Sequence, residues 1–238
     1  MRIKGWQRVS LIDYPSKIST VVFIGGCNLY CPYCHNSDMI SYSKGEIEFS
    51  NEEIFNFLDK RKGLIEGVVI TGGEPTSSNG LYNFIRNIKE RGYSVKLDTN
   101  GFFPKRLKNL IEKGYIDFVA MDVKNSEFKY LETVGKLNVD INKVKQSMDI
   151  IRNSGIDYEF RTTVVKEYHN KEDLIEIVDW IKGSKKWAIQ QYHDSYKNVN
   201  RNLNPIDVNI INEIVNYGKN KIDKIELRGF SYNNLKVS

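Results

Sequence analysis

The sequence has no apolar run long enough to cross a membrane. Near the amino terminus the longest purely apolar stretch covers only residues 21–24, whereas a membrane helix needs about 20 apolar residues. Residues 1–17 carry some positive charge but no apolar segment typical of a signal peptide. The sequence therefore predicts no membrane association and a cytoplasmic location.

An excess of charge of one sign is also nearly absent. The 35 Lys and Arg residues against 30 Asp and Glu give a net charge of only +5, and no run of five or six like charges occurs. This mild excess gives no indication of nucleic-acid binding. The sequence also lacks a phosphate-binding glycine-rich loop followed by lysine, and no G-x-G-x-x-G motif opens a helix.

Cysteine is scarce, and its placement is informative. The chain has three cysteines among 238 residues, and all of them fall within residues 27–34. An odd number in so short a segment does not suit a disulfide framework. It indicates a reducing compartment and a bound metal centre.

What the sequence does contain is an alternation of two patterns. With 40% hydrophobic and 27% charged residues, the chain has the composition of a globular protein, and we expect one domain over residues 1–238. Segments with the apolar spacing of amphipathic helices, such as residues 81–88 and 174–181, separate short β-branched runs. The predicted strands cover residues 18–24, 67–71, 94–97, 117–121, 158–165 and 187–191, with a last short run at 224–227.

Alternation of strands and helices predicts an α/β fold of parallel βαβ units with right-handed crossovers. Six clear units are fewer than the eight that close a full barrel. The pattern fits an incomplete (β/α)6 TIM-like barrel that is open at the side, and it also fits an open doubly wound sheet. The polar stretch 192–204 follows neither period and predicts a long loop.

The cysteine segment, CNLYCPYC at residues 27–34, directly follows the first of these strands. The carboxyl end of a strand is where parallel α/β folds bind ligands. Iron–sulfur clusters usually take four cysteines, so three would leave one iron open for chemistry. Zinc with His35 as a fourth ligand is the alternative, but structural zinc usually takes its ligands as two separated pairs. The spacing favours an iron–sulfur cluster.

The same spacing is the motif of the radical S-adenosylmethionine (SAM) superfamily. Residues 10–36, SLIDYPSKISTVVFIGGCNLYCPYCHN, resemble the amino terminus of glycyl-radical-enzyme activases, in particular the activating proteins of anaerobic ribonucleotide reductase. The resemblance extends to about His193. It implies a [4Fe–4S] cluster on Cys27, Cys31 and Cys34, whose fourth iron is chelated by SAM. One electron then splits SAM into methionine and a 5′-deoxyadenosyl radical.

Several polar segments at strand ends carry the rest of the resemblance. Alone, the TGGEP segment at 71–75 is a strand-ending turn, and DTNG at 98–101 and DVK at 122–124 are polar turns. Together they resemble the GGE, DTNG and DxK elements of the activases. That resemblance implies the following cofactor-binding residues: Tyr33 beside the adenine, Gly72, Gly73 and Glu74 at the SAM amino group, Asp98 and Asp122 as aspartates that help hold a monovalent cation, Asn100 in the DTNG element, and Lys124 at the SAM carboxylate.

Two further residues match the activases singly. Arg161 lies inside an apolar predicted strand, where it either forms a structural ion pair or faces SAM and the incoming peptide. His193 follows the sixth predicted strand and matches a histidine near the nucleoside. His169 lies in a polar turn and is assigned no role.

The resemblance implies an oxygen-sensitive, anaerobic enzyme that takes a hydrogen atom from one glycine of a partner, a glycyl radical enzyme. With three cysteines there is no room for additional ferredoxin-like clusters, which favours the compact ribonucleotide-reductase type. A low-potential donor such as flavodoxin or ferredoxin is the expected electron source. The alternatives are a radical SAM enzyme acting on a small molecule, such as a deazaguanine precursor, and a non-enzymatic cluster or zinc protein.

Overall fold

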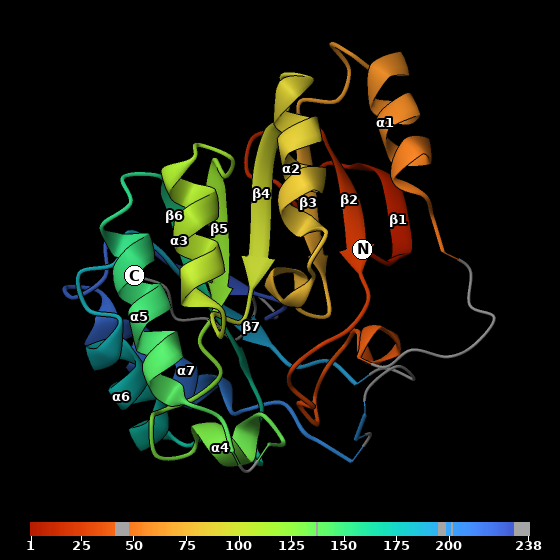
Figure 1. Cartoon of the computed structure of the whole chain (residues 1–238). Helices are drawn as coiled ribbons and strands as arrows, with labels where there is room; N and C mark the ends of the chain where they lie inside the picture. The colour runs from red at the N-terminus through yellow and green to blue at the C-terminus, as the bar shows by residue number, and fades with distance from the viewer. Residues whose placement is uncertain (41–47, 137, 195–198, 201, 231–238) are drawn as a thin grey trace. The chain divides into compact units, whose positions relative to one another are not determined.

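The computed structural model describes residues 1–40, 48–136, 138–194, 199–200 and 202–230. In these ranges eight strands form one open sheet whose strand order is the chain order (Figure 1). They are β1 (Ile3–Ser10), β2 (Ser19–Ile24), β3 (Gly67–Gly72), β4 (Ser94–Thr99), β5 (Phe118–Asp122), β6 (Asp157–Val164), β7 (Trp187–Gln191) and β8 (Ile225–Arg228). Pairs β2–β3, β3–β4, β6–β7 and β7–β8 are parallel. The predicted α/β class is confirmed.

Helices occupy the connections between the strands. They are the short 3₁₀ turns η1 (Ser37–Met39) and η2 (Pro75–Ser77), and the helices α1 (Asn51–Lys60), α2 (Leu81–Glu90), α3 (Pro104–Glu112), α4 (Tyr130–Thr133), α5 (Ile141–Arg152), α6 (Lys171–Trp180) and α7 (Val208–Gly218). Local sequence determines where several of them begin. Ser50 and Glu53 form a capping box at the start of α1, and Asn170 and Asp173 form another at the start of α6.

The first strand, β1, was not predicted from the sequence. β1 pairs with β2 in the antiparallel direction, and its register shifts twice. Only Ile3 and Ser10 of β1 are buried, so the strand carries no clean alternation of apolar and polar residues. Helices α1, α4 and α5 were also not predicted, although Val144, Met148 and Ile151 of α5 are buried at helical spacing. Of the predicted loop 192–204, residues 195–198 and 201 lie outside the described residues, and the rest contain no helix or strand.

The chain divides into two compact units. Unit 1 comprises residues 1–28, 36–120 and 142–157, and unit 2 comprises residues 29–35, 121–141 and 158–238. In unit 1 a core cluster of Tyr14, Val21 and Val69 is packed against Phe23 and Phe118. In unit 2 the largest fully buried side chains include Trp187, Tyr130 and Phe160.

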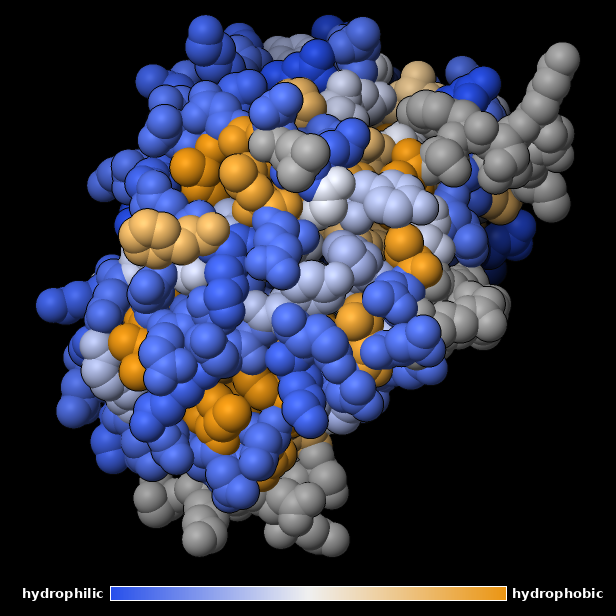
Figure 2. Space-filling model, turned by 90° about the horizontal axis from the view of Figure 1, so that it is seen from below, coloured by the Kyte–Doolittle hydropathy of each residue, from blue (hydrophilic) through white to orange (hydrophobic). Residues whose placement is uncertain are grey.

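The face of the molecule drawn in Figure 2 is mostly hydrophilic. On the face drawn in Figure 2, apolar residues form separate patches surrounded by hydrophilic ones. In the described ranges no helix is both long and apolar enough to cross a membrane.

Candidate cofactor site

In unit 1 the segment that leads into Cys27 packs against the glycines after β3. The carbonyl oxygen of Gly26 accepts a hydrogen bond from the Glu74 backbone N–H at 2.8 Å. A Cβ on Gly73 would lie 2.2 Å from that same oxygen, and one on Gly72 would lie 2.4 Å from the Ile24 carbonyl. Both positions need glycine because another backbone segment occupies the space of a side chain. The glycines predicted at the SAM amino group therefore also shape the approach to Cys27.

The Glu74 side chain is fully buried and joins the ends of β3 and β4. Its carboxylate accepts hydrogen bonds from the Asn100 backbone N–H at 2.7 Å and the Thr99 hydroxyl at 2.8 Å. It also accepts from the backbone N–H and hydroxyl of Thr76. Burial raises the pKa of Glu74, and these hydrogen bonds oppose that shift. Whatever Glu74 contributes to SAM binding, it holds the DTNG turn in place.

The Asn100 side chain connects this turn to the cysteine segment. Its Nδ2 lies 2.8 Å from the Asn28 Oδ1 and 4.0 Å from the Cys27 Sγ. Its Oδ1 accepts a hydrogen bond from the Phe102 backbone N–H at 3.2 Å. In unit 1, therefore, the GGE segment, the DTNG segment and Cys27 belong to one hydrogen-bonded assembly.

Asp98 is paired with a residue that the sequence analysis did not identify. The Lys96 Nζ lies 2.6 Å from the Asp98 Oδ1, and the Lys96 side chain is only 4% exposed. A lysine inside a strand of apolar residues was the available signal. Lys96 therefore already supplies a positive charge to the Asp98 carboxylate. The binding of a monovalent cation at this carboxylate stays a prediction.

In unit 2 the segment containing Cys31 and Cys34 is fixed to the end of α4. The Tyr30 N–H donates to the Val134 carbonyl at 3.1 Å, and the Cys34 N–H donates to the Cys31 carbonyl at 3.0 Å. Gly135 has a φ of +63°, and a Cβ there would lie 2.2 Å from the Tyr30 carbonyl oxygen. A glycine is thus required beside the residue that precedes Cys31.

The three cysteines form no disulfide. Burial raises the pKa of the Cys31 thiol to about 11, and Lys124 acts in the opposite direction. Thiolates are the ligands that iron–sulfur clusters take, so iron must displace the Cys31 proton when it binds. Three thiols have the chemistry that such a cluster takes, and their joint binding of one cluster stays a prediction.

The Tyr33 side chain is buried together with its hydroxyl group. Its hydroxyl has no hydrogen-bond partner among the described residues, and burial raises its pKa well above the usual value. Its ring centroid lies 5.8 Å from that of Tyr168 and 6.4 Å from that of His169. A buried hydroxyl without a partner fits a residue that completes its hydrogen bonding with a bound ligand.

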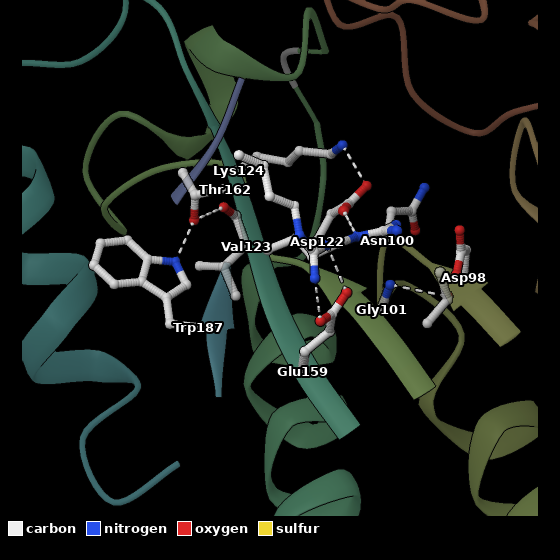
Figure 3. A network of polar contacts seen from close by, with 12 residues as sticks. Asp98, Asn100, Gly101, Asp122, Val123, Lys124, Glu159, Thr162 and Trp187 are labelled. Atoms are coloured by element: carbon white, nitrogen blue, oxygen red, sulfur yellow. Dashed lines mark hydrogen bonds and ion pairs between the residues drawn. The ribbon is translucent and has the colours of Figure 1, made fainter. Parts of the chain in front are cut away.

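Asp122, Lys124 and Arg161 form one ion-paired group in unit 2. The Asp122 carboxylate lies 2.8 Å from the Lys124 Nζ and 2.9 Å from the Arg161 Nε, and Figure 3 shows Lys124 directed back toward Asp122. Burial acts to raise the pKa of Asp122, but Arg161 and Lys124 outweigh it and lower the pKa to about 2. Burial acts to lower the pKa of Lys124, and Asp122 raises it well above the usual value. The group carries two positive charges and one negative charge.

Buried polar residues support the backbone of this group, and the sequence analysis did not identify them. The Trp187 indole N–H donates to the Thr162 hydroxyl at 3.0 Å, and that hydroxyl donates to the Val123 carbonyl at 2.9 Å (Figure 3). The His169 Nε2 lies 2.9 Å from the Lys124 carbonyl. His169, which was assigned no role, is buried and helps to fix the Asp122–Lys124 backbone.

His35 and His193 are connected by one hydrogen bond. The His35 Nε2 lies 3.1 Å from the His193 carbonyl oxygen, and the His35 ring stacks on Tyr192 with centroids 5.9 Å apart. A carbonyl can only accept, so Nε2 carries the proton and Nδ1 is the ring nitrogen left for a metal. The family match reported below, rather than this contact, favours an iron–sulfur cluster over zinc with His35 as the fourth ligand.

The low pKa of Asp122 gives a testable dependence of stability on pH. A carboxyl with a pKa of 3.8 when unfolded and about 2 when folded contributes about 2 kcal/mol above pH 4, which is lost as the pH falls toward 2. We expect Asp122→Asn to lower the unfolding free energy at pH 7 by about 3 kcal/mol, because Arg161 and Lys124 lose their partner. The variant should also lose less stability than the parent as the pH falls below about 4, because it has no carboxylate to protonate at this position. Urea unfolding of the apoprotein between pH 3 and 7 measures both effects.

The matched control is Asp149→Asn. The Asp149 carboxylate is 69% exposed and pairs with Arg152 at 3.6 Å on the surface of α5, so this change should leave the unfolding free energy nearly unaltered. An Asp122→Asn variant whose unfolding free energy falls with decreasing pH as steeply as that of the parent would contradict the low pKa of Asp122.

The chain is similar to several known proteins. Residues 21–181 match the model of the Radical SAM superfamily. The chain belongs to the radical SAM superfamily. A Methanocaldococcus jannaschii protein provisionally named a glycyl-radical enzyme activating enzyme is 36% identical over 234 residues, which is 95% of each chain. The pyruvate formate-lyase-activating enzyme of Clostridium pasteurianum is 27% identical over 204 residues, which is 81% of this chain and 82% of that enzyme.

A solved structure has a similar architecture. The structure of Streptococcus suis SuiB bound to S-adenosylmethionine superposes with a TM-score of 0.69 at 16% identity, over 92% of this chain and 55% of that one. This likeness concerns the fold alone. Taken with the superfamily match, the relatives make the chain a radical SAM enzyme of the glycyl-radical-enzyme activating class, whose cofactors are a [4Fe–4S] cluster and SAM.

Proposed function

We propose that this enzyme activates anaerobic ribonucleotide reductase by taking one hydrogen atom from a glycine of that protein. The observation that carries the proposal is the segment 10–36, in which SLIDYPSK precedes β2 and the CNLYCPYCHN motif follows it. The small number of cysteines supports the same choice, since three suffice for one open cluster and leave none for a second.

In this proposal Cys27, Cys31 and Cys34 hold the [4Fe–4S] cluster. When bound and reduced by one electron, the cluster and SAM supply a 5′-deoxyadenosyl radical, which is the chemistry of the cofactor rather than of the chain. The residues of the chain bind and orient SAM and keep water away from the reacting atoms. The half-buried and buried positions of the three cysteines suit that task.

The ion-paired group of unit 2 suits the SAM carboxylate. Lys124 stays protonated because Asp122 raises its pKa, and with Arg161 it gives the group a net positive charge that attracts an anion. Asp122 holds both cations in fixed positions at 2.8 and 2.9 Å. We assign Lys124 to the SAM carboxylate and Arg161 to SAM or the incoming glycine segment.

Other residues would recognise the remainder of SAM. Gly72, Gly73 and Glu74 would accept the SAM amino group, Tyr33 would lie beside the adenine with its hydroxyl as a donor, and His193 would lie near the nucleoside. Asp98 and Asn100 complete the cofactor-binding set. Flavodoxin or ferredoxin is the proposed electron donor, since the cluster requires a low-potential electron.

The proposal is tested with anaerobically reconstituted enzyme, dithionite, SAM and the anaerobic ribonucleotide reductase of the same host. We expect a glycyl-radical doublet in the electron paramagnetic resonance spectrum and formation of 5′-deoxyadenosine. Pyruvate formate-lyase and a deazaguanine precursor serve as competing substrates in parallel reactions. A glycyl-radical doublet on pyruvate formate-lyase alone, or turnover of the deazaguanine precursor alone, would contradict the proposal that anaerobic ribonucleotide reductase is the target.

A further inference from the structure

The buried amide of Asn100 has one orientation that its surroundings allow. Its backbone N–H donates to Glu74 at 2.7 Å, and its Oδ1 accepts from the Phe102 N–H at 3.2 Å. With Oδ1 used in this way, the NH₂ group must face the other side. There it meets the Asn28 Oδ1 at 2.8 Å and the Cys27 Sγ at 4.0 Å.

The two hydrogens of this NH₂ group therefore have two separate acceptors, one oxygen and one sulfur. Asn100 is only 5% exposed, so water does not compete freely for the amide. The carboxylate of the buried Glu74 accepts a hydrogen bond from the Asn100 backbone N–H and so holds that backbone. The donor is thus held rigidly beside the sulfur that begins the cysteine motif.

A hydrogen bond to a cysteine sulfur changes the energetics of an iron–sulfur cluster. Reduction adds one electron and one negative charge to the cluster, part of which lies on the sulfur ligands. An N–H donor at such a sulfur stabilises the reduced form more than the oxidised form and so raises the reduction potential. No proton is transferred in this step, and the electron comes from an external low-potential donor.

We propose that Asn100 is a positioning residue that raises the reduction potential of the cluster by donating from Nδ2 to the Cys27 sulfur. This inference rests on the proposed role of Cys27 as a cluster ligand and is independent of which glycyl radical enzyme is the partner. It gives the DTNG segment a function in electron uptake besides its place in the SAM site. It also explains why Glu74, Asn100 and Cys27 form one connected assembly within unit 1.

The test is a redox titration of the reconstituted full-length enzyme without SAM or partner, followed by electron paramagnetic resonance of the reduced cluster. In Asn100→Ala the donor is absent, and in Asn100→Asp an acceptor oxygen of the same size takes its place. We expect both variants to bind the full amount of iron and sulfide. At a fixed potential their ratio of reduced to oxidised cluster should fall about tenfold, which corresponds to about 59 mV for one electron. Asn100→Asp should show the larger fall, because it also adds negative charge.

Two controls separate this effect from a general disturbance. Asn87→Asp alters an exposed amide of α2 whose Nδ2 donates to the Asn83 carbonyl, and it should leave the potential unchanged. Asn28→Ala removes the competing acceptor, so the Asn100 amide is left to Cys27 and the potential should stay the same or rise. Fully loaded Asn100 variants that titrate like the parent would overturn the proposal.

If the Asn100 variants fail to load iron, the Asn28→Ala variant provides the test. A fall of the reduction potential of the cluster in loaded Asn28→Ala would also overturn the proposed role of Asn100. The titration uses no partner protein, so a missing glycyl radical bears only on the proposed target. A parent enzyme that binds no cluster would instead overturn the proposed function itself.

Discussion

Cys31→Ala is expected to lose most of the bound iron and to reduce 5′-deoxyadenosine formation by about 100-fold or more, because three thiolates are the minimum that can hold the cluster. The chain has no fourth cysteine to substitute for the one removed. Iron and sulfide analysis after anaerobic reconstitution measures the first effect, and chromatography of the reaction with dithionite and SAM measures the second. Cys27→Ala and Cys34→Ala should behave in the same way.

The control for this series is Tyr30→Phe, directly beside Cys31. The Tyr30 side chain is exposed, and its contact with α4 runs through backbone atoms, which the substitution leaves in place. This variant should bind iron and cleave SAM like the parent. Full SAM cleavage by Cys31→Ala would show that the reaction does not depend on the three-cysteine cluster.

Gly135→Ala is expected to prevent normal loading of the cluster although residue 135 is no ligand. The added Cβ would lie 2.2 Å from the Tyr30 carbonyl oxygen in a backbone with φ of +63°. A left-handed conformation costs an alanine about 1–2 kcal/mol, and here the backbone that precedes Cys31 must move as well. We expect iron content to fall several-fold and the unfolding free energy to fall by more than the conformational cost alone.

Gly155→Ala separates these two contributions. Gly155 has a φ of +77°, but nothing lies within 4 Å of the position its Cβ would take. This substitution carries the conformational cost without the collision, so the variant should lose about 1–2 kcal/mol of stability and bind iron fully. Equal iron content in the two variants would refute the role of Gly135 in placing the cysteine segment.

The sequence was sufficient to predict the strands whose residues are β-branched and buried. Strand β7 has the predicted bounds Trp187–Gln191, and β2 to β6 begin or end within one or two residues of the predicted limits. The antiparallel β1 was missed because most of its side chains are partly exposed, so its apolar pattern is weak. A strand can be recognised in a sequence when the side chains on at least one of its faces are buried, because those positions are then apolar.

Sequence patterns likewise identified some residues of the site and missed others. Segments at strand ends were identified because their motifs are compact in sequence. The residues that support them were not, since Thr162 and His169 acquire their roles only through contacts made in the fold. Gly135 lies about a hundred residues from the cysteine motif in the sequence and meets it only through the backbone of Tyr30. Single-sequence patterns carry no information about such pairs.

Isotope transfer tests the central claim of this account most directly. The partner reductase is produced with glycine deuterated at the α-carbon and is incubated anaerobically with this enzyme, dithionite and SAM, and the 5′-deoxyadenosine is analysed by mass spectrometry. The proposed reaction predicts one deuterium in 5′-deoxyadenosine, in an amount that matches the glycyl radical formed. Unlabelled 5′-deoxyadenosine alongside a reductase that carries no radical would contradict it.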